Sequence, residues 1–309
     1  MPNDIKELAL AELRTRYGNI TQLSGSRSMY SIGNDAARVY FRYSKPHNGR
    51  GTFYGLRAQD LQELEGHPSA ICFLWDGQQE PLVIPFADYE DVFNSVSPAS
   101  DGQYKAHVLF DETGTDLHIA RAGAFNVEGN FGWSALDILI DNSRLTKVPD
   151  LSHSQVQTLL GAIGNFKGYE VWVPASDRST MDWTIVKRFE CRDAAPTGFQ
   201  SVLHILQEVD VVWLKRGSSE LRALFEVEHS TPIYSGLLRF NDVRIEAPAM
   251  NPRFTIVANE VRRDRFVRQV ERPTFRTSGL EKLCSFLDYS NVYSWYRRVA
   301  TPDQSLQPQ

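Results

Sequence analysis

The sequence contains little cysteine, and the cysteines that it has follow no functional pattern. Only three occur among 309 residues, and no two of them form a CxxC pair. Three widely spaced cysteines exclude a disulfide framework and a cysteine-based zinc cluster. The chain also lacks GxGxxG, Walker A, HExxH and GxSxG motifs. We therefore expect no nucleotide cofactor and no serine-hydrolase elbow.

Long apolar segments and a strong excess of charge are absent as well. No window approaches the roughly 18 apolar residues that a membrane span requires. Residues 1–18 have the pattern of a charged amphipathic helix, without the apolar core of a signal peptide. We therefore expect a cytoplasmic protein with no membrane partner. The net charge of −5, from 33 Lys and Arg against 38 Asp and Glu, does not by itself favour a nucleic-acid partner.

What the sequence does contain indicates two globular domains. A length of 309 residues is large for one hydrophobic core, and the hydrophobic fraction of 42% is ordinary for a globular chain. Residues 141–150 are polar, include a proline and separate two unlike halves, as a linker does. We predict one domain over residues 1–145 and a second over residues 150–300. The expected fold class of the whole chain is α+β or α/β.

The first half has the pattern of a β-rich domain. After the opening helix, short aromatic and β-branched segments alternate with turn residues. The glycine-bearing residues 49–55 follow no nucleotide-binding rule and are interpreted as a loop, and residues 56–64 are predicted to be a helix. The pattern predicts a small β-barrel with peripheral helices. The predicted strands are residues 37–44, 69–75, 80–86 and 104–110.

Charge in this half is strongly segregated. Residues 27–57 contain six Lys or Arg and one acid, whereas residues 58–102 contain nine acids and no Lys or Arg. Such sorting predicts a cationic surface suited to phosphate, and aromatic residues lie between the cations, as in nucleic-acid-binding sites. The alternatives are a solvated basic loop and aromatic residues that pack the interior. The candidate contact residues are Arg42, Lys45, Arg50, Arg57 and Lys105.

The second half has the pattern of an α/β domain with a mixed central sheet. A helix capped by Asp150 or Ser152 has apolar residues at helical spacing and ends at Gly168. Strands are predicted over residues 169–174, 184–189, 209–214, 222–229 and 253–259. Further helices are predicted over residues 232–246, 261–271 and 279–298.

Three acids occupy special positions on two neighbouring strands of this half. Glu226 and Glu228 are two residues apart and therefore share one face of their strand. An antiparallel hairpin brings Asp210, at the start of the preceding strand, near the same face. Carboxylates that converge in an apolar sheet are costly unless they are neutralised, and Mg²⁺ suits carboxylate oxygens. The alternative is an edge hairpin whose acidic face lies in water.

These acids resemble the motif of the PD-(D/E)XK nuclease superfamily, the fold of most restriction endonucleases. Asp210 matches its first acid and Glu226 its second. Glu228 stands where most members have lysine, which is an ExE variant carried by a minority of restriction enzymes. The resemblance covers about residues 150–275. It implies metal-dependent phosphodiester hydrolysis, with Asp210 and Glu226 as Mg²⁺ ligands and Glu228 as a further ligand or a general base.

A basic segment follows the last strand of this region. Residues 253–276 contain seven arginines against three acids. The planar guanidinium is well suited to phosphate because it bonds two oxygens at once. The alternative is an exposed helix with internal ion pairs. The candidate DNA-backbone contacts are Arg262, Arg263 and Arg265.

Together these features predict a type II-like restriction endonuclease that cleaves double-stranded DNA at specific sites with Mg²⁺ and acts as a homodimer. The first domain is then expected to recognise DNA, with an architecture similar to the B3-like pseudobarrel of some restriction enzymes. One alternative is a DNA-binding protein that does not cut, which the missing lysine motivates. Another is a nuclease that acts on RNA or on modified DNA.

Overall fold

The computed structural model describes residues 2–23, 26–33, 35–46, 51–111, 114–145, 148–196, 199–248, 250 and 252–300. The chain divides into two compact units, Met1–Thr146 and Lys147–Pro302, which we call the N-terminal and the C-terminal unit. Helix α4 (Ser134–Leu145) occupies the first half of the predicted linker, so the polar segment is partly helical. Among the described residues, no helix combines the length and the apolar character that crossing a bilayer requires.

Two β-sheets form most of the N-terminal unit. The five-stranded sheet has the order β1-β2-β3-β5-β6 and the four-stranded sheet the order β4-β7-β8-β9. Strands β3 and β5 pair in parallel, and the other pairings are antiparallel. The strands are β1 (Ile20–Gln22), β2 (Met29–Ile32), β3 (Ala37–Ser44), β4 (Gly51–Arg57), β5 (Ser69–Trp75), β6 (Leu82–Pro85), β7 (Gln103–Asp111), β8 (Gly114–Ile119) and β9 (Gly123–Asn126). The helices are α1 (Pro2–Tyr17), α2 (Ala58–Gln62), α3 (Phe86–Ser95), η1 (Glu128–Asn130) and α4.

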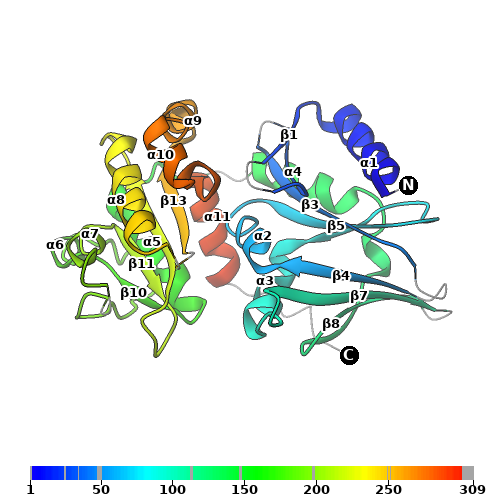
Figure 1. Cartoon of the computed structure of the whole chain (residues 1–309), viewed down its shortest axis with the longest axis horizontal. Coiled ribbons are helices and arrows are strands. Elements are labelled where there is room, and N and C mark those ends of the chain that lie inside the picture. The colour runs from blue at the N-terminus through cyan, green and yellow to red at the C-terminus, as the bar shows by residue number, and fades with distance from the viewer. Residues whose placement is uncertain are drawn as a thin grey trace. The chain divides into compact units, whose positions relative to one another are not determined.

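The two sheets of this unit share one apolar core. Tyr40 and Phe73 from the five-stranded sheet are buried with Tyr54 from the four-stranded sheet. The other face of the five-stranded sheet is covered by α1 and α4, which contribute Leu13 and Leu136 to a second core. A helical layer, a five-stranded sheet and a four-stranded sheet are therefore stacked in this order (Figure 1). The described strands form no closed barrel, so the barrel prediction is wrong. Strands β3 and β5 are buried on both faces, which requires a cover on each.

Two local predictions in the N-terminal unit are also wrong. The sequence predicts a loop over residues 49–55, yet the segment from Gly51 onward is strand β4, paired with β7. Gly55 lies against the Gln103 side chain there: a Cβ atom would lie 1.7 Å from Gln103 Oε1, so that flexible side chain would have to move. The predicted helix over residues 56–64 is shortened to α2, since β4 continues through Arg57.

The C-terminal unit begins with the predicted helix, α5 (His153–Phe166). Ser152 rather than Asp150 is its N-cap. The Ser152 hydroxyl accepts a hydrogen bond from the Gln155 backbone N–H, and the Gln155 side chain accepts one from the Ser152 N–H. This reciprocal pair is a capping box, which satisfies two backbone donors at the helix start. Gly168 follows the helix with φ of 79°, a conformation that glycine adopts without strain.

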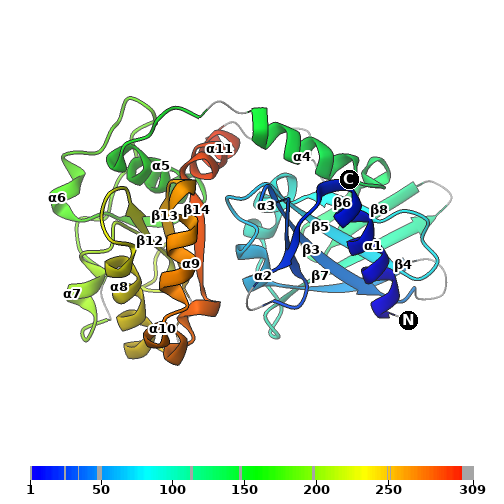
Figure 2. The same ribbon diagram turned by 90° about the horizontal axis from the view of Figure 1, so that it is seen from above.

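A mixed sheet of order β10-β11-β12-β13-β14 forms the centre of the C-terminal unit, as predicted. The β10-β11 and β11-β12 pairings are antiparallel, and the β12-β13 and β13-β14 pairings are parallel. Helices α5 and α11 cover one face, and α8, α9 and α10 cover the other (Figure 2). The strands are β10 (Glu170–Trp172), β11 (Val211–Leu214), β12 (Leu221–Glu228), β13 (Arg253–Ala258) and β14 (Cys284–Asp288). The helices after α5 are α6 (Ala175–Arg178), α7 (Leu203–Leu206), α8 (Ile233–Glu246), η2 (Glu260–Arg262), α9 (Arg263–Val270), α10 (Pro273–Ser278), η3 (Leu280–Lys282) and α11 (Tyr289–Ala300).

Two predictions in the C-terminal unit fail. Residues 184–189 form turns and irregular backbone instead of a strand. Val186 is buried in the core with α5, so its apolar character serves packing and not pairing. The predicted helix over residues 279–298 is interrupted by the fifth strand, β14, which pairs in parallel with β13. Its buried residues continue an apolar pattern into α11, which hides the boundary in the sequence.

Candidate active site

Glu226 and Glu228 lie together near the carboxyl end of β12, on the face covered by α8. Their neighbours Phe225 and Val227 face the opposite core under α5 and α11, as strand alternation requires. The two glutamates are almost completely buried, at 0% and 2% exposure. The alternative of a solvated acidic edge therefore does not apply to these side chains.

Asp210 is held against the same strand by the backbone. The β11-β12 ladder starts at the Val211–Phe225 pair, so Val227 lies beyond it. The Val227 N–H donates instead to Asp210 Oδ2 at 2.7 Å. The Asp210 carbonyl accepts a hydrogen bond of 2.9 Å from Gln157 of α5. These two hydrogen bonds fix Asp210 opposite Val227, which lies between the two glutamates.

A glycine brings helix α8 close to the acids. A Cβ atom at Gly236 would lie 2.9 Å from Glu228 Oε1 and 3.0 Å from Glu226 Cβ. Both distances are shorter than ordinary van der Waals contacts. The missing side chain at Gly236 therefore makes room for the carboxylates between helix and sheet.

Arg239, one turn further along α8, binds Glu226 with both ends of its guanidinium. Its Nε donates to Oε1 at 2.7 Å, and an Nη atom donates to Oε2 at 2.6 Å. The Glu226 side chain is 1% exposed and that of Arg239 is 27% exposed. A buried carboxylate thus has a bidentate counterion that reaches the surface. The Glu228 Oε2 atom accepts a hydrogen bond from the Thr231 hydroxyl.

The three acids influence one another electrostatically. Burial raises the pKa of Glu226 and Glu228, and the nearby Asp210 carboxylate adds to the increase. Hydrogen bonds from Arg239 to Glu226, and from Thr231 to Glu228, act in the opposite direction. The hydrogen bond with Glu226 raises the pKa of the Arg239 guanidinium, which therefore stays protonated. The cluster needs positive charge, and Arg239 supplies part of it.

His153 is a site residue that sequence reasoning missed. Its Nε2 lies 3.6 Å from Asp210 Oδ2, and this contact raises the pKa of the imidazole while burial opposes the increase. His153 and Gln157 are spaced one turn apart on α5, which was the only available signal that they share a face. Arg239 was missed as well, because a single arginine 13 residues after Glu226 belongs to no short motif.

The donor chemistry of the cluster suits a divalent ion, although its three acids are not arranged around one and Arg239 competes at Glu226. Among the described residues, Asp210 Oδ1 and Glu228 Oε1 accept no hydrogen bond, whereas both Glu226 oxygens accept from Arg239. In the same part of the chain, no three His, Cys, Asp or Glu side chains are arranged to hold an ion. Carboxylate oxygens are nevertheless the ligands that Mg²⁺ prefers. A cation at this cluster would meet one unengaged oxygen each on Asp210 and Glu228, and the Arg239 guanidinium at Glu226.

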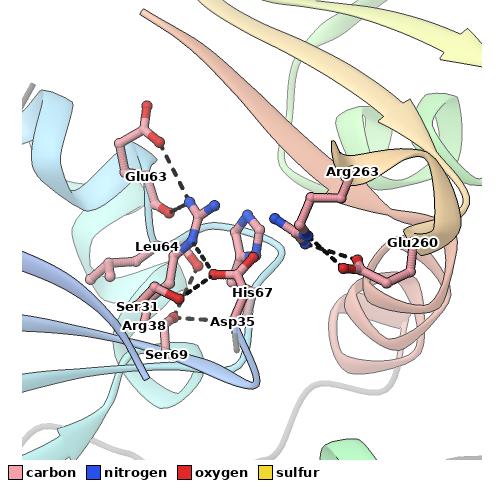
Figure 3. A network of polar contacts seen from close by, with 9 residues as sticks. All are labelled: Ser31, Asp35, Arg38, Glu63, Leu64, His67, Ser69, Glu260 and Arg263. Atoms are coloured by element: carbon pink, nitrogen blue, oxygen red, sulfur yellow. Dashed lines mark hydrogen bonds and ion pairs between the residues drawn. The ribbon is translucent and has the colours of Figure 1, made fainter. Parts of the chain in front are cut away.

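The predicted arginine contacts differ in how strongly the chain itself engages them. Arg262 donates to three backbone carbonyls, those of Glu228, His229 and Thr231. Arg263 binds Glu260 through two hydrogen bonds of 2.6 and 2.9 Å, drawn in Figure 3. Arg265 is exposed on α9 and has no ion pair within the described residues. Of the three, Arg265 is the one whose guanidinium is open to an external phosphate.

The predicted contacts of the N-terminal unit lie on two different sheets. Arg57 and Lys105 point away from the shared core of the four-stranded sheet, with Lys105 also bound to Asp101. Arg42 lies on β3 over the Tyr40 ring, and Lys45 is exposed just beyond that strand. Arg50 lies outside the described residues.

Arg38, another cation of the basic segment, serves the fold. It is 4% exposed and donates to the Glu63 carbonyl at 2.7 Å. Its guanidinium also lies 3.7 Å from Asp35 Oδ1, which accepts a hydrogen bond from Ser31 (Figure 3). The cations of residues 27–57 therefore do not form one surface, because at least one of them is buried with its own counterions.

Comparison with known proteins links the C-terminal unit to one family. The family model described as the type II restriction enzyme NmeDI C-terminal domain matches residues 139–303, which include the whole acidic cluster. The type II restriction enzyme NmeDI of Neisseria meningitidis serogroup C is 27% identical over 198 residues, or 61% of this chain and 53% of that enzyme. The chain thus spans about half the length of this curated relative. No solved structure matches the chain.

Proposed function

Because the chain belongs to the family of the type II restriction enzyme NmeDI C-terminal domain, we propose that it is a metal-dependent, site-specific endonuclease of double-stranded DNA. The observation that carries the proposal is the cluster of Asp210, Glu226 and Glu228 within the matched residues. Three carboxylates gathered at the end of buried strands are costly, and a bound divalent cation compensates for that cost. We also propose that Asp210, Glu226 and Glu228 form an ExE variant of the PD-(D/E)XK motif.

The roles of the acids follow from their surroundings. Asp210, fixed by the Val227 N–H, and Glu226 hold a Mg²⁺ ion, and Glu228 is a third ligand or the base that accepts a proton from the attacking water. When bound, the ion supplies Lewis acidity toward the scissile phosphate and makes a coordinated water more acidic. Thr231 orients Glu228 through its hydroxyl, and Gln157 holds the backbone of Asp210.

DNA recognition is assigned to the N-terminal unit and DNA-backbone contact to both units. The outer face of the four-stranded sheet carries Arg57 and also Lys105, which lies over the Phe53 ring, and this combination suits a phosphate backbone and exposed bases. Arg42, Lys45 and Arg50 are proposed as further contacts with the DNA. Two copies of the chain act on one duplex, since one acidic cluster cuts one strand.

A non-cleaving DNA-binding protein is the second candidate. The specific observation in its favour is that Arg239 occupies both oxygens of Glu226. If that ion pair never opens, Glu226 contributes to stability alone. The two candidates differ in cleavage and share salt-dependent DNA binding.

The first test of the proposed function is a cleavage assay with purified protein on unmodified and methylated phage and plasmid DNA. We expect discrete fragments in the presence of Mg²⁺ and none with EDTA, because the acids cannot activate water without the ion. Fragments that persist in EDTA contradict the metal dependence. Binding without any cleavage on either kind of DNA supports the second candidate, and a smear contradicts site specificity.

Two arginines of the basic segment are expected to respond differently to replacement by alanine. Arg262→Ala leaves three carbonyls of the β12–α8 connection without their donor. It should therefore lower the free energy of unfolding by about 2 kcal/mol. Arg265→Ala should leave stability unchanged and weaken DNA binding with a smaller salt dependence. Thermal melts and binding titrations at several salt concentrations measure both effects. Equal melting temperatures for the two variants would contradict the assignment.

A further inference from the structure

Arg239 is the strongest positively charged partner of the acidic cluster. Its hydrogen bonds of 2.7 and 2.6 Å engage both oxygens of Glu226. A bidentate pair of this kind is strong and geometrically specific. Without it, Glu226 is an uncompensated charge in the interior of the sheet.

The same pair blocks a role proposed for Glu226. Each of these oxygens keeps a second lone pair, but the guanidinium places a positive charge beside the carboxylate, and that charge repels a cation. Asp210 and Glu228, in contrast, each keep one oxygen that accepts no hydrogen bond within the described chain. Separation of Glu226 from Arg239 at one oxygen or both would remove this repulsion and let all three acids act on one ion.

The surroundings of Arg239 permit this separation. Its side chain is 27% exposed, so it is not enclosed by the protein. Arg262, by contrast, is held by three backbone carbonyls. A guanidinium held by one carboxylate can turn outward when that carboxylate gains another cation. One divalent charge then replaces the single charge that Arg239 provided.

We propose that Arg239 is an exchangeable counterion of the site. It holds Glu226 while no divalent ion is present, releases Glu226 when an ion is bound, and then contacts a phosphate oxygen of the DNA. The last of these steps rests on the proposed function, whereas the exchange at Glu226 does not. Arg239 would thus couple loading of the cation to engagement of the phosphate that is cut.

The exchange is tested first by the affinity for Mn²⁺ in the absence of DNA. Isothermal titration of Arg239→Met should show binding at least about tenfold tighter than in the wild-type protein, because a competing positive charge has been removed. Arg239→Lys keeps the positive charge but loses the bidentate guanidinium, and its gain in Mn²⁺ affinity should be smaller. Arg244→Met on the same helix is the control, since Arg244 donates to the Pro248 carbonyl and, among the described residues, has no contact with the acids. The Mn²⁺ affinity of this variant should be unchanged. A purely structural role for Arg239 predicts weaker Mn²⁺ binding in Arg239→Met, which would overturn the proposal.

A second measurement follows the exchange in the wild-type protein itself and uses a variant only to assign one signal. The arginine Nε–H signals of the wild-type protein are recorded by NMR, and that of Arg239 is assigned by its loss in Arg239→Lys. We expect the Arg239 signal to shift and to exchange faster with water as Mg²⁺ is added without DNA. A signal unchanged at Mg²⁺ saturation overturns the exchange.

Cleavage separates this inference from the proposed function. At saturating Mg²⁺, Arg239→Met should cut DNA about a hundredfold more slowly than wild type, because a contact to the developing phosphate charge is lost. Tighter Mn²⁺ binding with an undiminished cleavage rate overturns the phosphate contact and leaves the exchange standing. If the wild-type protein cuts no DNA, the proposed function fails while the Mn²⁺ and NMR results still decide the exchange.

Discussion

Replacing Asp210 with alanine is expected to abolish DNA cleavage while leaving DNA binding almost intact. Asp210 is the most exposed of the three acids, with 16% of its side chain accessible, and its Oδ1 accepts no hydrogen bond from the described residues. Its removal takes away a ligand that stabilises charge in the transition state. A loss of about 4 kcal/mol of that stabilisation corresponds to a rate reduction on the order of 10³.

Asp210→Asn separates this chemical role from a structural one. The amide keeps the shape of the side chain and an oxygen that accepts from the Val227 N–H. Unfolding and DNA binding should therefore resemble those of the wild-type protein, and cleavage should still fall on the order of 10³-fold. Asp242→Ala, an exposed acid on α8, is the matched control and should cut at the wild-type rate. Wild-type cleavage by Asp210→Asn would exclude Asp210 from catalysis.

The placement of the acids was predictable because it depends on local geometry. Strand alternation puts Glu226 and Glu228 on one face without knowledge of the rest of the fold. The hairpin between β11 and β12 is short, so Asp210 could be placed from the turn alone. The cap of α5 was predicted only as Asp150 or Ser152, and the structure selects Ser152, which forms a capping box with Gln155.

Arg239 illustrates what the sequence did not reveal. Its partner Glu226 is on strand β12, and the two side chains meet only because α8 packs on that strand with a particular crossing angle and register. The angle and the register depend on Gly236 and on the side chains that fill the interface, and hydrophobic periodicity does not encode them. The same limit explains Arg38, which has the sequence signature of a surface cation and is buried with Asp35 and Glu63.

The barrel prediction failed for a related reason. The alternation of apolar and polar residues indicates which faces of a strand are buried, but it does not show which other element covers each face. Strands β3 and β5 are buried throughout most of their length, which resembles a sandwich interior more than a barrel wall. Their second face is covered by α1 and α4, and α4 lies in a segment that appeared to be partly a linker.

Gly164→Ala is expected to destabilise the C-terminal unit, although helix propensity alone predicts the opposite. In the middle of a helix, alanine is favoured over glycine by about 1 kcal/mol. A Cβ atom at Gly164, however, would lie 2.4 to 2.8 Å from three ring atoms of Trp213. The Trp213 ring is 1% exposed and is packed against Tyr169, Phe225 and Trp295, so it has no space to withdraw.

The magnitude follows from this overpacking. Trp213 Nε1 also donates to the Leu160 carbonyl at 3.1 Å, and a displaced ring would lose that bond. We expect Gly164→Ala to lower the free energy of unfolding by about 2 to 3 kcal/mol. For a unit of this size, the melting temperature should fall by about 5 to 10 °C. Calorimetry and chemical denaturation measure both quantities.

A double-mutant cycle decides whether Trp213 is the cause. Gly164→Ala in a Trp213→Phe background should cost clearly less than in the wild-type protein, because the smaller ring relieves the contact. Gly129→Ala in the N-terminal unit, where a Cβ atom meets nothing within 4 Å, should leave the melting temperature unchanged. If Gly164→Ala stabilises the chain, helix α5 does not approach Trp213 as closely as described. In that case the Gln157 contact that holds Asp210 from the same helix would need to be revised, since both depend on the packing of α5 on β11.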